Sequence, residues 1–418
     1  MVSGLMPSQP RRGSLWRHAD FLKLWGGQSI SQVGTQVTVL ALPTAAIVLL
    51  HAGPVQIGAL EALQFLAFPV LGTTAGVWAD RLPRRPIMVI CDAGRALALA
   101  SVPATWLLGH LSMAQLFVVA VITGIATVFF DVSYQSYLPS LVAPEQLVDG
   151  NGKLELTRAG AGIGGPALAG ALIQVFQAPA AILADAISYV VSVLSLLWIR
   201  APEPRPSREG RRSFLAELWE GVLVVARHRQ ILLITGCTAT SNLGSNIAMA
   251  VYLLFAYHTL RLSPGEVGGV FAVGSVGAVL GALVAGWLGR RIGMGVVLLI
   301  SILLTGAGLA VPLAAYGLPL VVLGAIMLVT SIGVVLYNVN QVSYRQAAIP
   351  VRLQGRLNAT VRTVIWGTIP IGSALGGLLG ARIGLVPTLY LGAAVEVLSA
   401  GWILAGPIRL RETPTAPE

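Results

Sequence analysis

Residues 76–85 read GVWADRLPRR, a short polar stretch with one acid and three arginines. Two apolar segments flank it, Val55–Ala79 before and Ile87–Leu108 after. Each is long enough to cross a bilayer as a helix, which takes about 20 mostly apolar residues. The stretch therefore reads as a charged turn between two membrane-spanning helices.

The composition of the whole chain agrees with this interpretation. Of its 418 residues, 55% are hydrophobic and only 11% are charged, whereas soluble domains have about 25% charged residues. The net charge of +10 could indicate nucleic-acid binding. Because the arginines lie between apolar segments, they instead indicate membrane topology, and we expect no nucleic-acid partner.

The sequence lacks the residue patterns of metal sites and of ATP-driven enzymes. Its two cysteines, Cys91 and Cys237, fall inside apolar segments, where neither a disulfide framework nor a metal site is expected. A Walker A loop needs Gly-Lys-Ser/Thr, but Lys153 follows Gly152 and precedes Leu154. We expect no cofactor, no metal and no enzymatic activity.

The hydropathy pattern predicts an all-α membrane protein with twelve transmembrane helices. The predicted spans are Leu24–Leu50, Val55–Ala79, Ile87–Leu108, Ala114–Tyr134, Leu154–Phe176, Ala180–Ile199, Ile231–Tyr257, Glu266–Leu288, Val296–Ala315, Pro319–Tyr337, Leu357–Leu379 and Val386–Ala405.

Lysine and arginine collect in cytoplasmic loops, and most of the 27 lie on one side if the N-terminus is inside. We therefore expect both termini in the cytoplasm and the protein in the plasma membrane. The predicted units are a cytoplasmic N-terminus (1–23), a six-helix bundle (24–199), a cytoplasmic linker with an amphipathic helix (200–230), a second six-helix bundle (231–405) and a cytoplasmic tail (406–418).

The two halves contain related stretches. Proline, glycine and arginine recur at matched positions, so that Pro54 and Gly58 correspond to Pro264 and Gly268, and Arg158 and Pro166 correspond to Arg362 and Pro370. Both matches fall in equivalent spans of their halves, which favours a six-plus-six duplication. Transporters with two parallel repeats place the substrate site between the halves near mid-membrane.

Two motifs resemble those of the major facilitator superfamily. In the turn, Gly76, Asp80, Arg81, Arg84 and Arg85 match its signature between the second and third spans, although proline replaces the usual glycine at position 83. In the fifth span, "AGIGGPALAG" resembles the antiporter motif of the family, with matches at Gly165, Pro166 and Gly170. "YLPSLVAPEQL" and "DAISYVVSVL" are similar to the drug and macrolide efflux branch.

The resemblance implies roles for these motifs. Asp80 ends a helix, where the helix dipole disfavours an acid, and its implied partner is the N-terminus of the eleventh span near Leu357. This contact would close a gate between the halves; the alternative is a charge cluster that only sets topology. The glycines around Gly165 and Pro166 allow either tight packing alone or a dry, bendable seal.

Several ionisable residues lie within the predicted spans, where they are functional candidates. A charge network of Asp92, Arg95, Asp131, Glu155 and Arg158 is expected beneath the turn, either for structural pairing or for tuning the gate.

Three other acids, Glu61, Asp185 and Glu396, lack a local cation. A carboxyl of this kind suits a proton carrier. Glu61 is the first candidate for proton coupling and Asp131 the second, because Asp185 and Glu396 lie in spans that are usually peripheral in the family.

The substrate cavity is expected between spans 1, 4, 7 and 10, where amide and aromatic side chains suit a bulky amphipathic molecule. Cavity candidates are Gln28, Gln32, Gln36, Phe130, Asn242, Asn246, Tyr252 and Asn338. The same residues could instead join helices to one another.

Our leading interpretation is a monomeric, proton-coupled exporter of a hydrophobic or amphipathic small molecule that works by alternating access in the lipid bilayer. Siderophore or metabolite export, or import, is the alternative within transport. A lipid-handling or receptor-like protein that transports nothing is the alternative from another class.

Replacing Asp80 with asparagine tests the gate hypothesis. The carboxylate would be lost without a change in side-chain size, so transport should be crippled while membrane expression stays normal. Export rates in whole cells, normalised to the amount of protein, are the measurement. An unchanged rate in Asp80→Asn would remove the gate hypothesis.

Overall fold

The computed structural model describes residues 15–79, 81–201, 203, 223, 225–349 and 351–406. For residues 73, 74, 76, 77, 79, 351–353, 355, 356 and 359, only the backbone is described. Asp80 and most of the predicted linker helix, including Phe214, Leu218 and Val222, lie outside the described residues.

The described chain consists of helices joined by short connections. The first half contains α1 (Ala19–Leu50), α2 (Pro54–Ala79), α3 (Arg84–Leu107), α4 (Met113–Leu141) and α5 (Leu147–Trp198), with short turns η1 (Leu15–Arg17) and η2 (Pro144–Gln146). The second half contains α7 (Arg229–Leu254), η3 (Phe255–Thr259), α8 (Pro264–Ile292), α9 (Met294–Thr305), η4 (Gly306–Tyr316), α10 (Pro319–Ala348), α11 (Val351–Ile383), α12 (Leu385–Leu398) and α13 (Ala400–Leu404).

These helices make an all-α membrane fold. Ten helical segments of the described residues are long and apolar enough to cross a membrane. One of them contains α5, which holds two predicted spans that meet at Gln177, a residue with a left-handed φ of 68°. The less apolar α7 corresponds to the remaining predicted span, and η4 and α13 prolong α9 and α12.

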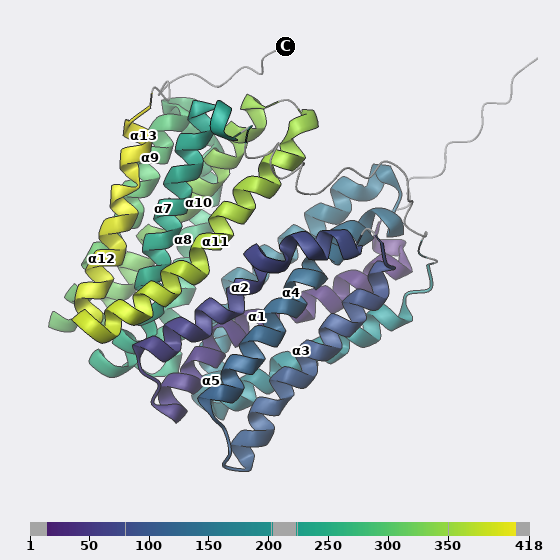
Figure 1. Cartoon of the computed structure of the whole chain (residues 1–418), viewed down its shortest axis with the longest axis horizontal. Coiled ribbons are helices and arrows are strands. Elements are labelled where there is room, and N and C mark those ends of the chain that lie inside the picture. The colour runs from purple at the N-terminus through teal and green to yellow at the C-terminus, as the bar shows by residue number, and fades with distance from the viewer. Residues whose placement is uncertain are drawn as a thin grey trace, which may run out of the picture.

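The helices form two bundles that lie side by side (Figure 1). In the first bundle α1 and α3 pack on α5, and α2 and α3 pack on α4; in the second, α8 and α9 pack on α10, and α11 and α12 pack on α7. The main contacts between the bundles are α2 with α11 and α5 with α8. The bundles meet at the lower left of Figure 1 and diverge upwards.

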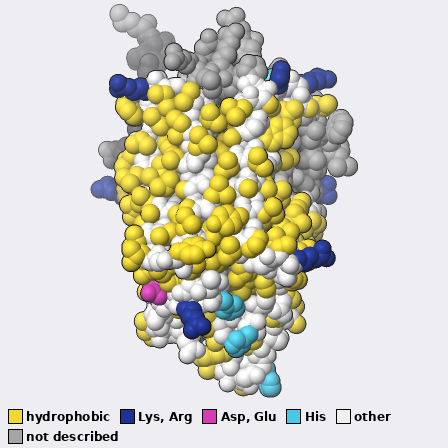
Figure 2. Space-filling view, turned by 90° about the vertical axis from the view of Figure 1, so that its left-hand side faces the viewer, with side chains coloured by type: hydrophobic (Ala, Val, Ile, Leu, Met, Phe, Trp, Pro, Cys, Tyr) yellow, Lys and Arg dark blue, Asp and Glu magenta, His cyan; other side chains and the backbone are white. Residues whose placement is uncertain are grey.

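The outer surface of the bundles is suited to lipid. Large apolar side chains such as Leu97, Leu107 and Leu283 are each about three-quarters exposed (75%, 77% and 74%). Figure 2 shows hydrophobic side chains in a broad band, with histidine, lysine and arginine mostly towards its two ends. Such a surface would be an aggregation hazard in water but matches the hydrocarbon core of a bilayer.

We distinguish the two ends of the molecule by their charges. The basic face carries Lys23, Arg84, Arg85, Arg229 and Arg290, and the opposite face carries His51, Arg261 and Arg382.

Several helices extend beyond the apolar segments that predicted them. α4 ends at Leu141 rather than Tyr134, and α10 ends at Ala348 rather than Tyr337. A helix of 30 residues is about 45 Å long, whereas the hydrocarbon core measures about 30 Å. The ends of such helices therefore reach the headgroup region and water, where polar residues are tolerated. Hydropathy alone placed these ends too early.

Candidate substrate cavity and gating contacts

Glycines make the two helix crossings that join the bundles. A Cβ at Gly170 of α5 would lie only 2.6 Å from the Cα of Gly268 in α8 and 2.9 Å from the carbonyl oxygen of Pro264. At the other crossing, a Cβ at Gly377 of α11 would lie 3.0 Å from the Cα of Gly58 in α2. Both contacts bring backbone against backbone, which only glycine allows.

The crossings link the sequence repeat to the contact between the halves. Gly58 and Gly268, which the repeat matches, take equivalent positions near the start of α2 and α8. Each packs against a helix of the other half. The repeated glycines therefore close the opposite face through two related crossings.

Other contacts between the halves lie between this face and the centre of the molecule. The Thr44 and Tyr257 hydroxyls are 3.0 Å apart, and the Gly265 amide donates to Gln174 over 3.2 Å. Nearer the centre, the Ser275 hydroxyl donates to the Gly162 carbonyl over 3.2 Å. The halves are thus joined at the opposite face and from there inwards to the centre of the molecule.

The antiporter-like motif divides between two contacts. A Cβ at Gly165 would overlap the side chain of Gln36 on α1, and Gly170 makes the crossing with α8. Gly160 and Gly164 of the same helix have nothing within 4 Å of such a Cβ. Close packing in this stretch therefore belongs to Gly165 and Gly170.

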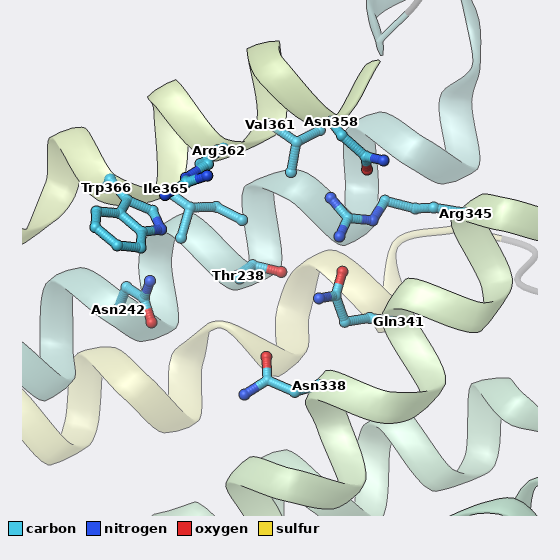
Figure 3. A pocket seen from close by; sticks show the side chains of 10 residues that line it. All are labelled: Thr238, Asn242, Asn338, Gln341, Arg345, Asn358, Val361, Arg362, Ile365 and Trp366. Atoms are coloured by element: carbon cyan, nitrogen blue, oxygen red, sulfur yellow. The ribbon is translucent and has the colours of Figure 1, made fainter. Parts of the chain in front are cut away.

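A polar cavity of about 390 Å³ opens in the second bundle (Figure 3). It lies in the part nearer the basic face, because Arg345 is close to the end of α10 and Asn358 is close to the start of α11. Its lining comes from α7, α10 and α11: Thr238, Asn242, Asn338, Gln341, Arg345, Asn358, Val361, Arg362, Ile365 and Trp366. Of the predicted cavity residues, Asn242 and Asn338 are in this set. A cavity of this size is in the range of small-molecule sites.

Other faces of α11 border an apolar groove. Its volume is about 730 Å³, and its lining comes from α2 and α11, including Leu63, Leu66, Val364 and Leu375. One helix therefore adjoins both a polar cavity and an apolar hollow between the bundles.

The other predicted cavity residues lie elsewhere. Gln28 is buried and donates to Ser192 over 3.2 Å. Tyr252 is buried and packs on Phe271, with ring centroids 5.8 Å apart. Phe130 is also buried. The half-buried remainder, which does not line the cavity, consists of Gln32, Gln36 and Asn246.

The predicted charge network contains a buried core. Asp92 and Arg95 form an ion pair on α3, and both are almost fully buried. The Arg95 guanidinium also lies over the rings of Phe130 and Tyr189, 4.5 and 4.3 Å from their centroids. Burying one partner alone would be costly, so the pair and its aromatic neighbours fix α3 against α4 and α5.

The rest of the network surrounds Asp131. Glu155 and Arg158 form a separate, exposed ion pair of 2.7 Å on α5. The Asp131 carboxyl interacts electrostatically with Arg95, Arg158 and Arg362. Arg158 and Arg362 are the arginines that the repeat matches, and they act on one carboxylate from α5 and α11.

Asp185 and Glu396, two of the three acids expected to lack a local cation, have hydroxyl partners within their own half. The expectation is wrong for Asp185, because the Arg95 guanidinium also acts on its carboxyl. Asp185 accepts hydrogen bonds from Thr38 and, over 3.0 Å, from Ser188. Glu396 lies next to Thr305 and Ser241. Both acids are buried, so they hold neighbouring helices of one half together.

Glu61 differs from these acids because it lies at the contact between the halves. Its carboxyl on α2 neighbours the hydroxyl of Ser373 on α11. It is three residues from Gly58, where α2 crosses α11. No described cation acts on it. Relative motion of the halves would therefore change the surroundings of this carboxyl.

The basic turn is attached to the end of α5. The backbone amides of Arg84 and Arg85 donate to the Glu203 carboxylate over 2.6 and 3.2 Å. The Arg85 side chain donates to the carbonyls of Leu196 and Leu197 over 2.7 and 2.6 Å. Glu203 therefore caps α3, a role that the sequence did not reveal.

The remaining turn residues contribute less to these contacts. Arg81 is exposed, and Gly76 lies within α2. Leu357, near the expected partner site of Asp80, is buried among Val225, Ile231 and Val361 of its own half.

Two helical bundles joined at one end, with a polar cavity towards the other, define a membrane transporter architecture. Residues 24–257, over half of the chain, match the Major Facilitator Superfamily. The chain belongs to this family. It is a multi-pass membrane transporter and not an enzyme.

Three relatives span almost the whole chain. Multidrug efflux pump Tap of Mycolicibacterium fortuitum is 27% identical over 92% of this chain and 94% of its own. The uncharacterized MFS-type transporter YfiS of Bacillus subtilis (strain 168) is 25% identical, with coverages of 92% and 90%. Macrolide efflux protein A of Streptococcus pyogenes is 24% identical, with coverages of 87% and 90%.

Solved structures share the fold. A bacterial homologue of the iron transporter ferroportin in its inward-facing state gives a TM-score of 0.74 at 20% identity, over 94% of this chain and 99% of that chain. The outward-facing state of a bacterial ferroportin homologue gives a TM-score of 0.60 at 20% identity, with coverages of 92% and 98%.

Leucine at Gly170 tests the crossing of α5 with α8. Overpacking costs about 1–3 kcal/mol, which should lower the ratio of closed to open molecules by a factor of about 5 to 150. A cysteine at Thr44, which is 1% exposed, should then react faster with a membrane-impermeant maleimide.

Gly160→Leu is the matched control, because a Cβ at Gly160 meets nothing within 4 Å. It should leave the rate of Thr44→Cys labelling unchanged. If Thr44→Cys were labelled equally fast with and without Gly170→Leu, the crossing of α5 with α8 would not close the opposite face.

Proposed function

We propose that this chain exports an amphipathic small molecule in exchange for protons by alternating access. The observation that carries the proposal is the asymmetry of the molecule: backbone crossings join the halves at the opposite face, while the polar cavity lies towards the basic face. A transporter that works by alternating access needs a conformation open to one side of the membrane and a second conformation open to the other side. The relatives named as efflux pumps support export as the direction.

The basic face is assigned to the cytoplasm on the positive-inside rule. Both termini are then cytoplasmic, and the conformation is open to the cytoplasm. The higher TM-score against an inward-facing structure than against an outward-facing one supports this assignment. The protein acts as a monomer in the plasma membrane, because one chain supplies the whole lining of the polar cavity and both partners of each crossing.

The gate belongs to the same proposal. In the outward-open state, Asp80 binds the N-terminus of α11, where free amides favour an anion. Arg84 and Arg85, attached to Glu203 and to the end of α5, keep the turn in place. Gly165, Pro166 and Gly170 supply the dry seal.

Glu61 is the proposed proton carrier. Its carboxyl lies at the contact of α2 with α11 and has the Ser373 hydroxyl as its neighbour. Ionisation there without a cation is unfavourable, so the closed contact favours the protonated carboxyl. Opening of the opposite face admits water and permits the exchange of a proton. Asp131, which interacts with cations of both halves, is the second candidate.

Glutamine at Glu61 tests the coupling. The amide preserves the shape and the contact to Ser373 but cannot carry a proton. Proteoliposomes with an imposed pH gradient should lose uphill export of a panel of apolar and amphipathic dyes, while downhill movement of the dyes remains. A proton crossing the membrane contributes about 2.3 kcal/mol per 100 mV. In Glu61→Gln this energy should no longer be coupled to movement of the dye.

Glu145→Gln, at an exposed acid in η2, is the matched control and should keep gradient-driven export. Retained proton-driven export in Glu61→Gln would exclude Glu61 as the carrier. A chain that moved no dye in either direction would contradict the transport proposal and favour a receptor-like protein.

A further inference from the structure

The polar cavity has an uneven charge. Two of the ten residues that line it are arginines, and none of these ten is a carboxylate. Three asparagines, a glutamine and a threonine supply neutral polar groups, and Trp366, Ile365 and Val361 supply apolar surface. The cavity wall is therefore cationic.

Arg345 on α10 is the key residue of this wall. The residue is only 7% exposed, and its Nε is buried without a hydrogen-bond partner. Its neighbour Gln341 is 5% exposed, and the Oε1 of Gln341 also lacks a partner. Figure 3 shows the guanidinium of Arg345 directed from α10 towards the residues of α7 and α11. Buried polar groups are normally paired, so the Arg345 Nε and the Gln341 Oε1 could each form a hydrogen bond with a ligand.

The described acids leave Arg345 without a countercharge. Among the residues that the structure describes, the phenol of Tyr337 is the one ionisable side chain that acts on the Arg345 guanidinium. In the first half, Asp131 on α4 interacts with Arg95, Arg158 and Arg362, and not with Arg345. The charge of Arg362 is thus shared with Asp131, while that of Arg345 is available to a ligand.

We propose that this cavity binds the anionic group of an amphipathic substrate, with Arg345 contacting a carboxylate, sulfonate or phosphate directly. A guanidinium presents donors that match two oxygens of such a group. Gln341 and Asn338 complete the polar wall, and Trp366 and Ile365 contact the apolar part. This inference rests on the proposed transport function and specifies its substrate as an anion.

Two fluorescent probes of nearly equal shape test the charge preference. 8-Anilinonaphthalene-1-sulfonate carries a sulfonate that its parent, N-phenyl-1-naphthylamine, lacks. Each is titrated into the purified full chain in nanodiscs of phosphatidylcholine without any gradient, and empty nanodiscs give the lipid background. The anionic probe should bind about tenfold or more tightly than the neutral one, which is the range expected for a hydrogen-bonded charge.

Arg345→Gln should reduce the affinity for the anionic probe to that for the neutral probe and leave the latter unchanged. Unchanged binding of the neutral probe also shows that the variant is folded. Arg345→Lys should retain part of the preference for the anionic probe, because lysine keeps the positive charge but cannot donate two parallel hydrogen bonds. Arg382→Gln removes an exposed cation at the end of α11 on the opposite face and should change neither affinity.

Competition separates two sources of the anion. Displacement of the anionic probe by naphthalene-1-sulfonate, but not by an equal concentration of inorganic sulfate, supports an amphipathic anion. Equal displacement by sulfate would overturn the proposal, since the site would then take a free ion. Equal affinity for the two probes, or a preference that survives Arg345→Gln, would overturn it as well.

This test is independent of the transport assay. Loss of uphill dye export with intact anion binding would reject proton-coupled export alone. Export of neutral dyes without any preference for the anionic probe would reject the anionic substrate alone.

Discussion

The architecture depends on the approach of backbone to backbone at two helix crossings. At Gly170 and Gly268, and at Gly58 and Gly377, no side chain separates the helices of the two halves. Such contacts gain dispersion energy from many atoms at close range. Among the described residues, the crossings bury no ion pair and no extended hydrogen-bond network. The crossings can therefore hold one face closed and still separate at modest cost.

The interior of each half is joined differently. In the first half, Arg95 is paired with Asp92 on α3 and lies over Phe130 of α4 and Tyr189 of α5. A hydrogen bond from Thr38 to Asp185 joins α1 to α5. In the second half, Thr238 and Tyr337 are joined by a hydrogen bond of 2.8 Å. Polar interactions inside a low-dielectric bundle are expensive to break. The halves should consequently move as rigid bodies, with the deformation confined to the glycine crossings.

Sequence patterns were sufficient for the fold because hydropathy and charge report directly on the bilayer. The spans follow from apolar length, and the match of Pro54 and Gly58 with Pro264 and Gly268 indicated a duplication. The structure adds that both matched glycines lie at the crossings between the halves. The cavity was harder to predict, since it depends on where helices end. Arg345 lies beyond the predicted span, because the apolar segment stops at Tyr337, whereas α10 continues to Ala348. The role of Glu203 as the cap of α3 was not predicted, because it lies 119 residues from Arg84 and such a distant contact leaves no local sequence pattern.

The most direct test is to fix the crossing of α5 and α8 with a disulfide. A Cβ at Gly265 would lie 3.5 Å from that of Gln174, within the range of a disulfide, so the pair Gln174→Cys and Gly265→Cys should oxidise readily. The account predicts that oxidised protein in proteoliposomes transports nothing, and that a reductant restores the rate of the unmodified chain. Full transport while the disulfide is intact would contradict it, because the halves would then not need to separate at this face.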